Sequence, residues 1–371
     1  MLALFLAGPS TAGAATGITF GVQPATPTYG QTVTFSGVVS GGSPGDQVDL
    51  IANTGSGWNL VTSTTTAANG SYSFPVAATT PGSYAAQTQG PTSGAVVLVL
   101  RPRLTSRVTG LRYPGSKVLL KGRLTPATAG TLTLHQGGHS RNVTVHANGT
   151  YSARLLTRSG GRHRARLVLS PGNGFVAREV IRRYRLATPS LSIGSSGKGV
   201  LALERRLKGL HYGLRPSNGF YGVDTYEAVL AFQKVYRMGR TGRVSSKVWN
   251  RLGVAKVPKA RRPHGDHIEV DKTRQVLFEV RSGVVVRVIH VSTGATGNTP
   301  VGNWHVYWKL PGLNSHGMYY SLFWLRGFAI HGYASVPAWP ASHGCVRIPM
   351  WQAPGLFSRW SVGATVFVYY S

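Results

Sequence analysis

The sequence predicts a multidomain, mainly β protein with two tandem β-sandwich domains, a small helical domain and a C-terminal β-rich domain. The first observation behind this fold class is composition. The chain has 48 glycines and only 13% charged residues, which favours turn-rich β structure over helical bundles. The second is length, because 371 residues exceed what one ordinary hydrophobic core organises. Several separate cores are therefore expected.

The third observation is an internal repeat in the N-terminal half. Residues 18–101 and 103–187 share a plan of short alternating strands broken by Gly, Pro and Asn. Gly37 corresponds to Gly122, 85 residues later. The segment Asn69-Gly70-Ser71-Tyr72-Ser73 corresponds to Asn148-Gly149-Thr150-Tyr151-Ser152, 79 residues later. Asn-Gly supplies the positive φ that tight hairpin turns require. The repeat predicts two immunoglobulin-like β-sandwiches, interpreted as scaffold rather than as a binding module.

The charge of the chain is strongly unbalanced. Forty Lys and Arg residues face ten Asp and Glu, a formal net charge of +30, which indicates an anionic partner. Arg162, Arg164 and Arg166 alternate with other residues, so a strand would place them on one face. A nucleic-acid module with interleaved aromatic residues is not recognisable. Nucleic acid is therefore not the expected partner, whereas acidic lipid and anionic wall polymers both qualify.

Residues 1–15 resemble a partial signal peptide. An apolar stretch is followed by Ala12-Gly13-Ala14, an A-x-A type cleavage site, although a basic segment before it is missing. We expect a secreted protein without a membrane span after signal cleavage, because no other run approaches the roughly 20 apolar residues that a span needs. The competing interpretation, a cytosolic nucleic-acid binder, requires this segment to remain uncleaved.

Residues 190–253 change to helical periodicity. Val200, Leu203, Leu207 and Leu210 are spaced as on one face of a helix. The segment resembles the peptidoglycan-binding domain of wall hydrolases and transpeptidases, on Gly194, Gly197, Gly219, Tyr221-Gly222, Thr225, Ala228-Val229, Phe232-Gln233, Gly242 and Trp249. The resemblance implies wall binding. A basic, proline-containing linker at residues 254–264 follows.

The C-terminal domain, residues 265–371, contains the only thiol of the chain. Apolar and polar residues alternate from Ile268 to Ile289, which predicts strands joined at Ser282-Gly283. Cys345 follows Ser342-His343-Gly344, and His331 lies 14 residues earlier. A thiol becomes a good nucleophile when a nearby imidazole accepts its proton or lowers its pKa. A glycine before it lets backbone N–H groups approach a developing oxyanion.

Two other interpretations of this cysteine are open. It could be a buried core residue beside structural histidines. Alternatively, His331, His343 and Cys345 could ligate zinc. A metallohydrolase usually needs an acidic general base, and no Asp or Glu follows Glu279, so we expect neither a metal nor a cofactor.

Residues 268–370 resemble the L,D-transpeptidase catalytic domain of the YkuD type. The resemblance rests on four sequence motifs: Val291-Ser292-Thr293-Gly294, Thr299-Pro300-Val301-Gly302, Ala329-Ile330-His331-Gly332 and Ser342-His343-Gly344-Cys345-Val346-Arg347. The resemblance implies Cys345 as nucleophile, His331 as base and His343 as a further site residue. The Gly332 carbonyl would orient the imidazole, and Gly344 would contribute to an oxyanion hole.

The same resemblance implies substrate contacts from Arg347, Ser342, Tyr319 and Tyr333. Arg347 stands where other members have Asn, and its bidentate guanidinium suits a substrate carboxylate. The implied reaction releases D-alanine from a peptidoglycan stem peptide through a cysteine thioester and forms a 3-to-3 cross-link. Hydrolysis of the thioester, an L,D-carboxypeptidase activity, is one alternative. A catalytically inactive, wall-binding adhesive protein is the other.

Overall fold

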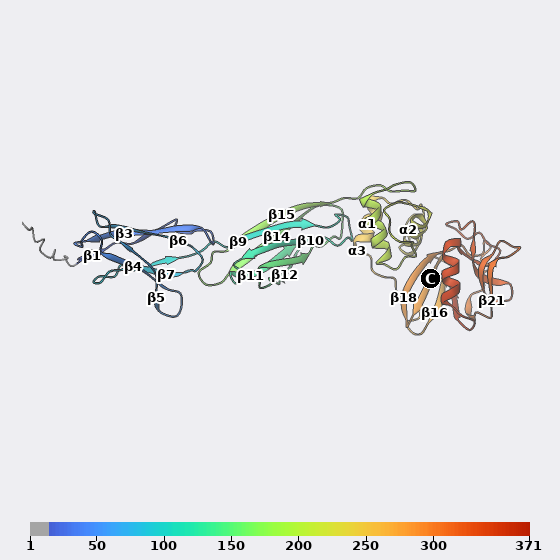
Figure 1. Cartoon of the computed structure of the whole chain (residues 1–371). Coiled ribbons are helices and arrows are strands. Elements are labelled where there is room, and N and C mark those ends of the chain that lie inside the picture. Colours follow the sequence, from blue (N-terminus) through green and yellow to red (C-terminus); the bar gives the residue numbers. More distant parts are fainter. Residues whose placement is uncertain (1–14) are drawn as a thin grey trace, which may run out of the picture. The chain divides into compact units, whose positions relative to one another are not determined.

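The computed structural model describes residues 15–371 (Figure 1), so the predicted signal segment lies outside the described residues except for Ala15. The described chain is mainly β, as predicted. It forms two compact units: residues up to 109 with 119–156 and 164–184, and residues 110–118 with 157–163 and 185–371. Within residues 15–371 no helix has the length and apolar character needed to cross a membrane. The predicted domain boundaries stay a prediction.

The first eight strands of the described chain form a β-sandwich. Its sheets have the orders β1-β3-β2, with β6 paired to β3, and β5-β4-β7-β8. Both sheets contribute to one core that includes Phe35, Leu50, Phe74 and Tyr84. The strands are β1 (Gly17–Ile18), β2 (Gly21–Gln23), β3 (Thr32–Ser40), β4 (Gln47–Asn53), β5 (Trp58–Thr65), β6 (Ser71–Ala77), β7 (Gly82–Gln87) and β8 (Val96–Leu98).

The next seven strands form two further sheets, in the orders β13-β10-β9 and β12-β11-β14-β15. They are β9 (Arg103–Thr109), β10 (Leu119–Thr125), β11 (Gly130–Gln136), β12 (His139–Val143), β13 (Thr150–Arg154), β14 (Gly161–Pro171) and β15 (Arg178–Leu186). The sequence repeat corresponds to a repeated contact. The Tyr72 and Tyr151 hydroxyls each donate to a backbone carbonyl. Gly37 and Gly122 lie under these rings, where a Cβ would overlap the hydroxyl.

Three helices begin the C-terminal half: α1 (Lys198–Lys208), α2 (Val223–Val235) and α3 (Ser246–Val254). The predicted helical spacing is confirmed, because the apolar positions on these helices are buried together. Their shared core includes Val200, Leu203, Leu207, Val229, Phe232 and Trp249. We call residues 190–253 the helical domain below.

The last part of the chain has two sheets, in the orders β18-β17-β16-β24-β19 and β20-β21-β22-β23, around a common apolar core. Ser282 and Gly283 have φ of 46° and 77° and form the predicted hairpin turn. The elements are β16 (His267–Asp271), β17 (Val276–Arg281), β18 (Val284–His290), β19 (Gly302–His305), β20 (Trp308–Leu313), β21 (Tyr319–Leu325), β22 (Phe328–Tyr333), β23 (Val346–Pro349), a 3₁₀ turn (Met350–Gln352), α4 (Ala353–Arg359) and β24 (Thr365–Tyr369).

Strand β17 differs from the half-exposed strand that an alternating sequence predicts. Its residues from Val276 to Val280 are all buried. Leu277 packs into the core between the two sheets, whereas Phe278 packs into the core of the helical domain. The polar residue Glu279 is also buried. Its carboxylate can be buried because the Arg359 guanidinium and the Trp360 indole donate hydrogen bonds to it. The helical domain therefore covers the second face of this sheet.

Candidate active site

The pairing of β22 with β23 places three candidate site residues on one face of a sheet. The two strands run parallel, with Ile330 opposite Val346 and His331 opposite Arg347. Successive side chains in a strand point to opposite faces. Ile330 and Val346 are fully buried in the core, so His331 and Arg347 lie on the other face. Cys345 directly precedes β23, and the same alternation brings it to the face of Arg347, diagonal to His331.

The His331 ring is held as the tautomer that a general base needs. Its Nδ1 lies 2.9 Å from the Gly332 carbonyl oxygen, so Nδ1–H donates and Nε2 keeps its lone pair. The ring is only 3% exposed. Burial, assisted by the charge of Arg347 and opposed by the bond to Gly332, lowers its pKa to about 4. The imidazole is therefore neutral near pH 7 and able to accept a proton.

Gly332 is fixed at its position by packing as well as by this hydrogen bond. A Cβ there would lie 2.8 Å from the Ala353 Cβ and 3.1 Å from the Met350 Cα. Real Cβ atoms do not approach neighbours so closely, so only glycine allows the 3₁₀ turn and α4 to pack against β22. Glycine is therefore required at position 332, whose carbonyl orients the His331 ring.

The Cys345 sulfur is half-buried. The backbone N–H of Ala329 donates to it, and the Gly327 carbonyl oxygen lies 3.6 Å away. Burial raises the pKa of the thiol, while the Ala329 bond and the Arg347 charge oppose the shift. This direction is opposite to the lowered thiol pKa that the sequence suggests. Since burial raises the pKa of the thiol and lowers that of His331, both groups are neutral near pH 7.

The turn before Cys345 is closed by the Ser342 side chain. Its hydroxyl donates to the Cys345 carbonyl oxygen at 2.6 Å and accepts the Gly344 N–H at 3.0 Å. Gly344 has φ of 133°, and a Cβ there would overlap the Phe328 ring, so glycine is required. The predicted oxyanion role of Gly344 and the predicted substrate contact of Ser342 stay predictions. Both would require this internal bond to open.

A neighbouring segment supports the same turn from outside. Asn298 Nδ2 donates to the His343 carbonyl at 2.7 Å, and Thr299 Oγ1 donates to the Gly344 carbonyl at 2.7 Å. The Ala295 N–H donates to the Ser342 carbonyl at 2.8 Å. Neither Asn298 nor the Thr299 hydroxyl was predicted as a site residue from the sequence. The only sequence signal for these residues is the motif that begins at Thr299. Its support of the Cys345 turn is visible only in the tertiary structure.

The other predicted site residues lie at different distances from the Cys345–His331 pair. Arg347 is half-buried, with its guanidinium carbon 4.1 Å from the centre of the Tyr333 ring. Tyr333 also makes an edge contact with His331 at 5.7 Å. Tyr319 pairs with Gly332 across β21 and β22. His343 is exposed, and residues 15–371 contain no group of three or more His, Cys, Asp or Glu side chains that could hold a metal.

This arrangement can perform acyl transfer. It contains a thiol, a neutral imidazole with a free Nε2 on the same sheet face, and a cation beside them. It also offers the backbone N–H of Cys345 at a sharp turn, where a tetrahedral oxyanion could be bound. Such a set can take an acyl group from an amide and hand it to an amine or to water.

Two known protein families match the C-terminal half of the chain. Residues 265–368 match the family described as YkuD, L,D-transpeptidase catalytic domain, and residues 196–252 match the putative peptidoglycan binding domain. An L,D-transpeptidase structure from Xylanimonas cellulosilytica is 34% identical, covers 49% of this chain and 98% of its own, and gives a TM-score of 0.47. An L,D-transpeptidase from Mycobacterium smegmatis is 12% identical, with 72% and 99% covered and a TM-score of 0.26. No match was found among curated proteins.

Proposed function

Residues 265–368 form an L,D-transpeptidase catalytic domain of the YkuD family, and from this premise we propose that Cys345 carries a thioester during 3-to-3 cross-linking of peptidoglycan. The observation that supports the proposal is the common sheet face of Cys345 and His331, with the free Nε2 of the imidazole. The donor is a tetrapeptide stem whose third residue is joined through its L-centre to a terminal D-alanine. Cys345 attacks the carbonyl carbon of that third residue.

In the acylation half-reaction, the thiol proton passes to His331 Nε2 as the bond between Sγ and the carbonyl carbon forms. The resulting tetrahedral oxyanion is stabilised by the Cys345 N–H, joined by the Gly344 N–H if Ser342 releases it. Collapse breaks the carbon–nitrogen bond to D-alanine, whose nitrogen takes the proton from His331. A thioester and free D-alanine result.

In the second half-reaction, a side-chain amine of another stem attacks the thioester carbon and gives its proton to His331. The thiolate leaves and recovers that proton, so a cross-linked dimer and the resting enzyme are formed. Water in place of the amine gives a tripeptide stem, which is the carboxypeptidase alternative. Arg347 lies on the same face as the reacting groups and is proposed to bind a stem carboxylate through its guanidinium fork.

The test is incubation of the full chain with a disaccharide-tetrapeptide, followed by mass spectrometry of the products. We expect D-alanine release together with a dimer joined between third residues. Tripeptide without dimer would replace cross-linking by trimming as the proposed function. Neither product, with wall binding retained, would favour the inactive adhesive alternative and would contradict an enzymatic role.

We also propose that the basic surface binds anionic wall polymers outside the membrane, where the substrate lies. On β14, Arg164 and Arg166 are exposed, whereas Ala165 between them and Leu167 after them are buried, so the arginines share a solvent face. The ion pair between Arg166 and Glu179, at 2.8 Å, neutralises one positive charge. Arg164 keeps the net charge of this face positive. Such binding is screened by salt.

This proposal is tested by retention on isolated cell walls before and after chemical removal of their anionic polymers. We expect retention at low salt to fall after that removal, and to fall on the intact walls when salt is added. Retention that responds to neither treatment would assign wall binding to the helical domain and its glycan contacts alone.

A further inference from the structure

The helical domain shares one hydrophobic core with the β18-β17-β16-β24-β19 sheet, which is the partner of the sheet that carries His331. Phe278 of β17 and Val288 of β18 pack in the same cluster as Phe232 of α2. The backbone is joined as well, because the Val288 N–H donates to the His211 carbonyl and the Gly213 N–H donates to the Val288 carbonyl, both at 2.8 Å. The contact between the helical domain and this sheet is therefore packed and hydrogen-bonded like the interior of one domain.

Lys234 of α2 is buried at the centre of this contact, with 1% of its surface exposed. Its ammonium nitrogen lies 3.1 Å from the Gln275 carbonyl oxygen, 2.8 Å from the Val291 carbonyl oxygen and 2.6 Å from His290 Nδ1. Burial lowers the pKa of this amine well below its ordinary value. The three acceptors nevertheless match the three hydrogens of an ammonium group, so the geometry favours the charged form. None of these three acceptors belongs to the helical domain.

The bond from Lys234 fixes the tautomer of His290. Because Nδ1 accepts, the ring proton is on Nε2, and this N–H donates to the Val336 carbonyl at 2.7 Å. Val336 belongs to residues 334–341, which join the His331 strand to the Cys345 turn and which we call the connecting segment. Lys234 thus holds that segment through one intervening imidazole.

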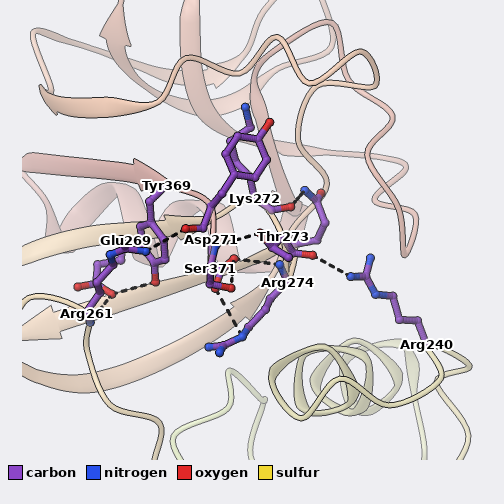
Figure 2. A network of polar contacts seen from close by, with 11 residues as sticks. Arg240, Arg261, Glu269, Asp271, Lys272, Thr273, Arg274, Tyr369 and Ser371 are labelled. Carbon is purple, nitrogen blue, oxygen red and sulfur yellow. Dashed lines mark hydrogen bonds and ion pairs between the residues drawn. The ribbon is translucent and has the colours of Figure 1, made fainter.

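Arg240 makes a second, direct link. One guanidinium nitrogen donates to the Ala338 carbonyl of the connecting segment at 2.9 Å, and the other donates to the Thr273 carbonyl at 3.0 Å. Figure 2 shows Arg240 reaching from beside the helices to Thr273, in the loop that follows β16. The next carbonyl of the segment, that of Trp339, accepts from Ser292 Oγ at 2.7 Å.

We propose that the helical domain is a positioning part of the active site, in which Arg240 and the Lys234–His290 pair set the conformation of the connecting segment between His331 and Cys345. This inference rests on the proposed transpeptidase function for its kinetic consequence. The segment returns the chain so that β23 pairs in parallel with β22, and its carbonyls at Val336 and Ala338 are held from the helical domain's side. A small displacement of a nucleophile relative to its base can cost a large factor in rate.

Arg240 is the residue to change, because its side chain is exposed and its removal leaves the released carbonyls accessible to water. Lys234→Met would leave three buried acceptors without their donor and is expected to lower stability. A loss of activity in that variant would therefore not distinguish positioning from unfolding. Arg243 is the matched control. It is exposed on the same domain, and within the described chain its hydrogen bonds are made by its main-chain N–H and carbonyl.

The experiment compares Arg240→Ala, Arg240→Lys and Arg243→Ala in the full chain. We expect Arg240→Ala to lower kcat about tenfold while KM changes less than about twofold, with the unfolding temperature unchanged. Arg240→Lys keeps one donor group and should recover part of the loss. Arg243→Ala should behave as the natural chain.

Alkylation by iodoacetamide across a pH series gives a readout that does not depend on the substrate, because Cys345 is the only cysteine. We expect Arg240→Ala to change the rate and pH profile of alkylation, and Arg243→Ala to leave both as they are. Identical turnover and alkylation in these two variants would overturn the positioning role. Absence of turnover in the natural chain would instead overturn the proposed function, while the alkylation comparison would still decide the role of Arg240.

Discussion

Cys345→Ala is expected to abolish release of D-alanine from a stem tetrapeptide, with a loss of about 10⁴-fold or more. The chain contains no other thiol that could take its place. Binding groups and oxyanion donors would remain, but no covalent intermediate could form. Release of D-alanine and the mass of the intact protein, followed together over time, measure the effect.

The natural chain should gain the mass of an acyl group when the acceptor amine is withheld, and also when it is treated with a carbapenem. Cys345→Ala should gain neither mass. Because the sulfur is half-buried and makes weak contacts, its loss should shift the unfolding temperature by only a few degrees. Cross-linking that persists in the folded alanine variant would rule out the thioester.

Local sequence patterns predict the fold class well, because its elements depend on residues that are close in the chain. The Asn-Gly turns, the Ser282-Gly283 hairpin and the helical spacing of Val200, Leu203 and Leu207 all describe local backbone geometry. The Cys345 motif similarly contains its own glycine and its own serine clamp.

Features that depend on distant residues were not predictable in this way. Lys234 belongs to a sequence typical of a short amphipathic helix, where a lysine is normally solvated. Its acceptors at Gln275, His290 and Val291 lie 41, 56 and 57 positions further on. Burial of both faces of β17 has the same origin. A strand pattern shows the alternation but not that a second domain covers the outer face.

The direction of the thiol pKa is a further example. The sequence indicates a histidine close enough to lower it, whereas burial raises the pKa of Cys345 and lowers that of His331 to about 4. Desolvation penalises both charged forms, and it depends on everything packed around the pair. We therefore interpret the resting site as a neutral thiol and imidazole, with proton transfer occurring during attack.

This interpretation predicts the pH dependence of the reaction. The active form of His331 is the neutral imidazole, and its fraction rises as pH increases through the pKa. The acid limb of kcat/KM should therefore have its midpoint near pH 4, well below the ordinary histidine value of 6.5, and activity should be nearly constant from about pH 5 to neutrality. Initial rates of D-alanine release from about pH 3 to neutrality measure both the midpoint and the plateau. A midpoint near 6.5 would mean that the imidazole is solvated in the working enzyme.

Removing the base should have the second largest effect. His331→Gln keeps a polar side chain of similar reach but cannot accept the thiol proton at Nε2, and the expected loss in kcat is about 10²- to 10⁴-fold. The residual rate should rise with pH, because attack then depends on spontaneous ionisation of a thiol whose pKa is raised. Natural chain and variant should therefore differ most at acidic pH and converge as the solution becomes alkaline. A constant ratio of their rates across the pH range would contradict general-base catalysis by His331 and would limit the imidazole to holding the site in shape.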